Sequence, residues 1–108
     1  MNAKQFNTKK EQLYKKYGCT PTDFSHEIFL ETKFGRHYIS SEYTPKIKVA
    51  CIHTKLNGDT EGFKKATNYQ INTYNGKCNF YSADPLYILQ ELEELLDNLI
   101  FLNGENNL

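Results

Sequence analysis

The last quarter of the chain carries a broad apolar stripe with helical spacing, and this stripe most limits what the rest can fold into. Asp84 and Pro85 suit the N-cap and first position of a helix, and apolar residues then recur every three or four positions as far as Leu102. Such a broad stripe is suited to covering a sheet. We therefore expect a sheet elsewhere in the chain, with Asn103-Gly104 ending this helix.

A second, narrower amphipathic helix is predicted over residues 3–17. Phe6 and Tyr14 share its apolar face, and lysines flank that face on both sides. Gly18 and Pro21 follow as the expected helix stop.

Between the two helices the hydrophobic pattern changes to period two, which is typical of strands. Residues 24–34 alternate regularly, and this predicts a strand with Phe24 and His26 on its mostly buried face. Gly35-Arg36 fits the two-residue loop of a type II′ hairpin and leads into a second strand, which Pro45 should end.

A central strand and a second hairpin are expected after Pro45. Residues 46–56 have no cleanly polar side, so we expect a central strand there, followed by a polar turn over 57–62. Residues 63–67 are interpreted as the entry to another strand. Asn75-Gly76 is the type I′ dipeptide, and it predicts a hairpin over residues 69–82.

The predicted fold is therefore α+β, with a single domain over residues 1–104 and a frayed tail at 105–108. An N-terminal helix precedes an antiparallel sheet of about five strands with two hairpins, and a C-terminal helix packs on the sheet. Both helices should cover one face, leaving the other at least partly open.

Composition excludes several classes of protein. Thirteen basic residues balance thirteen acidic ones, so the chain is neither a simple polycation nor a strongly acidic mimic of DNA. We find no leader-like start and no long uncharged apolar run, so we expect no membrane partner. Three distant cysteines suit reduced thiols, which predicts a cytoplasmic protein, in the host cytoplasm if a phage encodes it.

Candidate catalytic and metal-binding residues are few. Cys51 and His53 lie on one side of one predicted strand, but the pattern does not bring His26 or His37 to them as further metal ligands. No nucleophile, phosphate-binding or dinucleotide motif is found. We expect no cofactor, no metal and no catalysis, and keep a small enzyme or metal protein around Cys51 and His53 as a second alternative.

The neutral total conceals an uneven distribution of charge. Residues 1–56 hold ten basic and five acidic groups, a net +5, whereas residues 57–108 hold three and eight, a net −5. One hypothesis is that the two oppositely charged helices lie side by side. The same charges allow two copies to associate, or one face to meet a partner. A nucleic-acid partner would contact the basic residues of the first half: Lys4, Lys9, Lys15, Lys16, Arg36, Lys46 and Lys48.

Exposed aromatic residues among amides indicate a protein-binding surface, because tyrosine offers a large rigid area with a polar tip. The outer face of the second hairpin and the exposed side of the last helix provide such a surface. The candidate protein-binding residues are Gln70, Asn72, Tyr74, Lys77, Asn79, Tyr81, Tyr87, Glu91 and Glu94.

The function predicted from the sequence is that of a small non-catalytic protein-binding module. The bias toward Lys, Asn, Tyr and Ile is what an AT-rich coding sequence gives. The more specific hypothesis is therefore an accessory protein of a phage or mobile element that inhibits a host protein, such as a CRISPR-type or restriction nuclease, by occupying its surface. The first alternative is a nucleic-acid-binding protein that uses the lysine-rich N-terminal helix.

Overall fold

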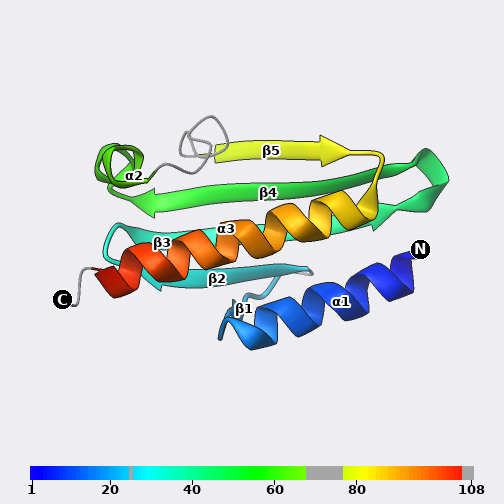
Figure 1. The fold of residues 1–108 in the computed structure, drawn as a ribbon, viewed down its shortest axis with the longest axis horizontal. Helices are drawn as coiled ribbons and strands as arrows, with labels where there is room; N and C mark the ends of the chain where they lie inside the picture. Colours follow the sequence, from blue (N-terminus) through cyan, green and yellow to red (C-terminus); the bar gives the residue numbers. More distant parts are fainter. Residues whose placement is uncertain (25, 68–76, 106–108) are drawn as a thin grey trace.

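The computed structural model describes residues 1–24, 26–67 and 77–105 and confirms the α+β class. The strands form one antiparallel sheet in the order β1-β2-β3-β4-β5, so each strand lies beside its neighbour in sequence (Figure 1). The elements are α1 (Ala3–Lys16), β1 (Thr20–Pro21), β2 (Glu27–Thr32), β3 (Gly35–Thr44), the 3₁₀ turn η1 (Pro45–Ile47), β4 (Val49–Gly58), α2 (Thr60–Ala66), β5 (Lys77–Ser82) and α3 (Pro85–Glu105).

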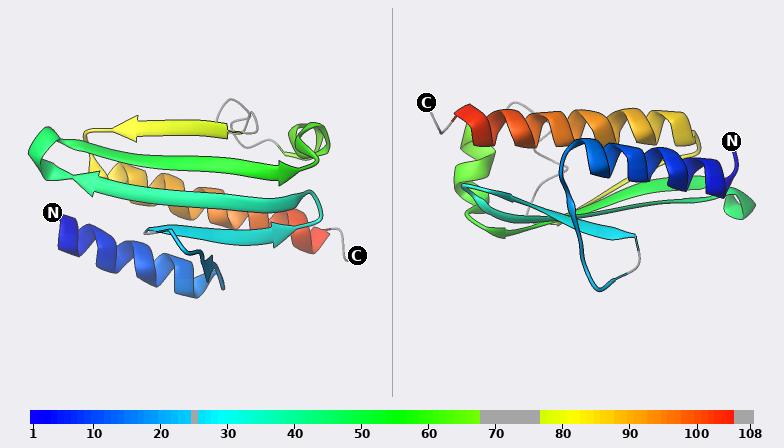
Figure 2. Two further views of the ribbon diagram at one scale, coloured as in Figure 1. Left: turned by 180° about the vertical axis from the view of Figure 1, so that it is seen from behind. Right: turned by 90° about the horizontal axis from the view of Figure 1, so that it is seen from below.

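The molecule has two layers, as expected. Figure 2 shows α1 and α3 on the same side of the sheet, and the buried apolar side chains fill the space between the layers. Leu92, Leu96 and Leu99 of α3 are fully buried there, together with Phe6 of α1 and Ile39 of β3. The broad stripe of the last helix thus covers the sheet, and α1 completes the layer.

The start of α3 is as predicted, and its end is not. The Asp84 carboxylate accepts a hydrogen bond from the Leu86 backbone N–H at 3.0 Å, which satisfies one of the free donors of the first turn. At the other end the helix runs through Asn103-Gly104 and reaches Glu105.

The first hairpin turns earlier than the sequence predicted. Thr32 pairs with Gly35, so the loop is Lys33-Phe34, and Gly35-Arg36 already belongs to β3. The Phe34 ring is buried 5.6 Å from the Phe63 ring. This contact with a residue distant in sequence favours Phe34 in the turn. Turn propensities depend only on neighbouring residues, so they could not predict it.

Two predicted strand segments lie outside the sheet. β2 begins only at Glu27, because His26 has a left-handed backbone with φ of 65°. Phe24 and His26 are therefore not on a buried face, and Phe24 is 75% exposed. The start of the predicted third strand, residues 46–48, instead forms η1 and a left-handed Lys48. The remainder, β4, is central between β3 and β5, as predicted.

Residues 60–66 form a helix where the sequence indicated a turn and a strand entry. Asp59 acts as its N-cap, and its carboxylate accepts a hydrogen bond from the Gly62 N–H at 2.9 Å. Phe63 is the buried anchor of this short helix. The second hairpin was predicted over residues 69–82. Its first strand and its turn, residues 69–76, lie outside the described residues, and its second strand is β5.

A buried lysine binds a backbone carbonyl of β3 that β2 does not reach. The last β2–β3 pair is Glu27 with Ser40, so the Ser41 carbonyl lies beyond the reach of β2. The Lys10 Nζ donates a hydrogen bond to this carbonyl at 2.8 Å and lies 3.0 Å from the His26 Nδ1. Lys10 is fully buried, and desolvation lowers the pKa of its amine. Sequence periodicity gave no indication of this contact.

We expect Gly35→Ala to destabilise the fold by about 3 kcal/mol or more, measured by urea unfolding. Gly35 has φ of +130°, and a Cβ there would overlap the Asn57 carbonyl of β4. Gly18→Ala is the matched control, because Gly18 also has positive φ but open space around it, and it should cost only about 1 kcal/mol. Equal losses in the two variants would contradict the close strand contact.

We expect Lys10→Met to lower the free energy of unfolding by about 1–2 kcal/mol, because it leaves the Ser41 carbonyl without its donor. Lys9→Met, one position away on the exposed side of α1, should leave stability within about 0.5 kcal/mol of the parent. Chemical unfolding of both variants decides the matter. A parent-like Lys10→Met protein would mean that the contact at the β3 edge contributes nothing.

Candidate functional site

The face of the sheet turned away from α1 and α3 is the main candidate surface, and we call it the open face. Directly paired residues share a face, so the register defines its members. Among the described side chains the open face holds Thr20, Glu27, Phe29, Glu31, Arg36, Tyr38, Ser40, Glu42, Thr44, Val49, Cys51, His53, Lys55, Asn57 and Tyr81. None of the described helices lies over it (Figure 2).

A hollow of about 390 Å³ lies on the open face. The small Ser40 side chain lies among larger ones, and Phe24, Tyr38 and His53 contribute rings to the lining. Glu27 and Lys55 also line it. The volume is within the usual range for ligand pockets, about 300–1,000 Å³.

Phe24 reaches the hollow from outside the sheet. The segment that joins β1 to β2 lies on the side of the sheet opposite to α3 (Figure 2, right). The Phe24 N–H donates to the Thr22 hydroxyl at 3.1 Å, and the Glu27 N–H donates to the Phe24 carbonyl at 3.3 Å. The Thr22 hydroxyl also donates to the Glu27 carboxylate at 2.8 Å. Local hydrogen bonds thus hold an exposed aromatic residue beside the open face.

Other aromatic side chains of the open face already make paired contacts. The Arg36 guanidinium lies 4.1 Å from the centre of the Phe29 ring and 2.6 Å from the Glu31 carboxylate. The His53 and Tyr81 rings meet edge to face at 5.6 Å, and Tyr81 remains 57% exposed. The open face is therefore rich in rings and carries both signs of charge.

The structure separates the predicted protein-binding residues into two groups. Tyr81 is on the open face, whereas Tyr87, Glu91 and Glu94 belong to α3 in the other layer. Glu91 is the main reason that the pKa of Tyr87 is raised. Gln70, Asn72 and Tyr74 lie outside the described residues, and for Lys77 and Asn79 only the backbone pairing with Lys55 and His53 is described. Sequence reasoning missed Phe24, Tyr38 and His53 as neighbours of one hollow.

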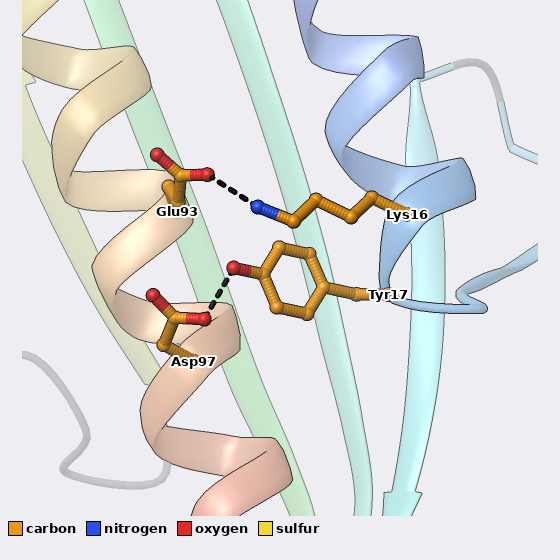
Figure 3. A network of polar contacts seen from close by, with 4 residues as sticks. All are labelled: Lys16, Tyr17, Glu93 and Asp97. Atoms are coloured by element: carbon orange, nitrogen blue, oxygen red, sulfur yellow. Dashed lines mark hydrogen bonds and ion pairs between the residues drawn. The ribbon is translucent and has the colours of Figure 1, made fainter.

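The predicted basic residues do not form one patch. Lys16 makes an ion pair with Glu93 of α3 at 3.1 Å, and the neighbouring Tyr17 hydroxyl donates to the Asp97 carboxylate (Figure 3). The side-by-side arrangement of the helices is thus confirmed. Arg36 is on the open face, Lys46 and Lys48 adjoin η1, and Lys4, Lys9 and Lys15 are exposed on α1.

The histidine and cysteine side chains that the structure describes do not converge. Cys51 and His53 share the open face, but His37 is fully buried on the helix side, and the described residues hold no cluster of three metal-ligating side chains. Burial raises the pKa of the Cys51 thiol and raises that of Cys19 to about 11. Both thiols are therefore protonated at neutral pH and are poor nucleophiles in this state.

Comparisons with protein-family models, curated proteins and solved structures give no match to this chain. Within the described ranges, no helix is both long enough and apolar enough to cross a membrane.

We expect the protein to lose up to about 3 kcal/mol of stability as the pH falls from 6.5 to 4, because of His37. Burial lowers the pKa of His37 from 6.5 to about 4 in the folded state, so the unfolded chain takes up the proton first. Its contribution is present above pH 6.5 and is lost as the pH falls toward 4. Urea unfolding across this range measures it.

His37→Leu should remove this part of the acid sensitivity, and His53→Leu on the open face should retain it. If the two variants show the same pH dependence, His37 does not carry the effect.

Proposed function

We propose that this protein is a small non-catalytic module that binds a protein partner through its open face. The observation that carries the proposal is the preformed hollow between Phe24 and the sheet, on a face that the helices leave uncovered. Large aromatic residues in partly buried positions are the usual anchors of protein interfaces. Phe24 and Tyr81 are both more than half exposed, and each is held by neighbouring groups.

The charge of the open face favours a protein over a nucleic acid. Among the described side chains of the open face, Glu27, Glu31 and Glu42 oppose Arg36 and Lys55, and Glu31 and Arg36 neutralise each other in an ion pair. The pairing of Lys77 with Lys55 adds a third basic position to this face. The charges of this face are therefore nearly balanced, whereas binding of a phosphate backbone requires an excess of positive charge. A mixed, ring-rich surface is typical of protein interfaces.

The hypothesis about the partner's identity comes from composition and not from the open face. The hypothesis that the module inhibits a host protein, such as a CRISPR-type or restriction nuclease, comes from the AT-rich character of the composition and stays a prediction. The alternative, nucleic-acid binding by Lys4, Lys9 and Lys15 of α1, uses a different surface from the open face. One experiment therefore separates the two.

We expect capture of the partner from nuclease-treated host extract to fall about tenfold or more when Tyr38 and Tyr81 are both changed to Glu. The matched control is Tyr87→Glu with Phe101→Glu, because these exposed aromatic residues lie on α3. Quantitative mass spectrometry of the bound protein measures the ratio, and thermal unfolding confirms that both variants fold.

Two results would contradict the proposal. One is a partner that the α3 variant loses and the open-face variant keeps. The other is that nuclease-treated extract yields no protein while untreated extract yields nucleic acid, with an affinity that falls steeply with salt and with Lys9→Glu.

A further inference from the structure

Three rings and the small Ser40 side chain line the hollow on the open face, together with Glu27, Thr54, Lys55 and Asn57. Ser40 and His53 are paired directly across β3 and β4, and Tyr38 and Lys55 form the next pair on the same face. Phe24 approaches from the β1–β2 segment. A flat group that enters the hollow therefore meets aromatic surface on several sides, which is the arrangement that rings prefer.

The charges around the hollow oppose one another. Glu27 of β2 lies beside Ser40, whereas Lys55 lies one strand further on β4, in the row of Tyr38. A cation in the hollow would face Lys55, and an anion would face Glu27. A neutral group that both donates and accepts a hydrogen bond suits both, because the carboxylate accepts and the ammonium donates.

We propose that the hollow binds a tyrosine side chain of the partner protein. The phenol is the neutral ring with a hydroxyl that donates and accepts, so it matches the three rings, Glu27 and Lys55 together. This inference rests on the proposed function, and it names the group that anchors the partner to the open face.

The hollow is formed before the partner arrives. Backbone hydrogen bonds of Phe24 with Thr22 and Glu27 fix the outer wall, and the proximity of Lys10 to His26 ties the same segment to α1. Because little ordering is left for the binding step, a single side chain can provide a large share of the affinity.

The test is a titration of the ¹⁵N-labelled protein with N-acetyl-tyrosinamide, followed by NMR. We expect the backbone amide resonances of Phe24, Ser40 and Lys55 to shift until the protein is saturated, with a dissociation constant in the millimolar range. N-acetyl-phenylalaninamide should bind about fivefold more weakly, because it lacks the hydroxyl, and N-acetyl-leucinamide should give no saturable shift. Absence of a saturable shift with the tyrosine probe would overturn the inference.

Ser40→Leu is the decisive variant, because a leucine side chain at this lining position occupies part of the hollow. It should weaken tyrosine-probe binding and partner capture by about tenfold or more. Thr44→Leu is the matched control, since Thr44 is exposed on the same strand and face but does not line the hollow. Dispersed amide spectra for both variants show that they fold. Phe24→Ala removes one ring of the lining without filling the hollow, and it should also weaken binding of the tyrosine probe.

The two levels of the proposal fail separately. Partner capture that depends on Tyr38 and Tyr81 but is unchanged by Ser40→Leu would overturn the tyrosine anchor and leave the open-face interface. Probe binding that Ser40→Leu abolishes, with no protein captured by the open face, would overturn the proposed function and with it the assignment to a partner's side chain.

Discussion

One buried ammonium group, that of Lys10, supports both layers of this fold. β3 continues past the residue at which β2 begins, and the first β3 carbonyl beyond their last pair would lack a donor without the lysine. The same amine lies within hydrogen-bonding distance of His26, where the chain turns out of the sheet. A buried amine is costly unless it is hydrogen-bonded, so its partners have to be in place together. The position of α1, the start of β2 and the route of the segment that carries Phe24 are consequently coupled.

Under the proposed function, the two faces of the sheet have separate tasks. The helix side holds nearly all of the buried apolar side chains, including the stripe of α3, and accounts for stability. The opposite side holds rings, mixed charges and a hollow, and its side chains contribute little to that core. Binding through the open face therefore requires no rearrangement of the packed layer. A partner tyrosine would complete a site whose walls are already positioned.

The sequence predicted what depends on periodicity and on single capping residues. The stripe of α3, its Asp84 cap and the central position of β4 follow from such local rules, and the structure has all three. The turn at Lys33-Phe34 and the helix around Phe63 were missed, because burial of one ring against another overrides turn propensity. The hollow was missed because its lining residues are far apart in the sequence. It joins Phe24, Tyr38 and His53 from three segments, and only the strand register and a left-handed His26 bring them together.

The uncovered sheet face also bears on how such a protein could change over time. Substitutions at open-face positions alter contacts with a partner while leaving the apolar layer under α1 and α3 intact, so most of them cost little stability. When a partner's surface changes, single substitutions on the open face can restore binding while the fold keeps its stability. The constraint falls instead on a few positions, such as Lys10 and Gly35, whose replacement would disturb the scaffold that every version of the recognition surface needs.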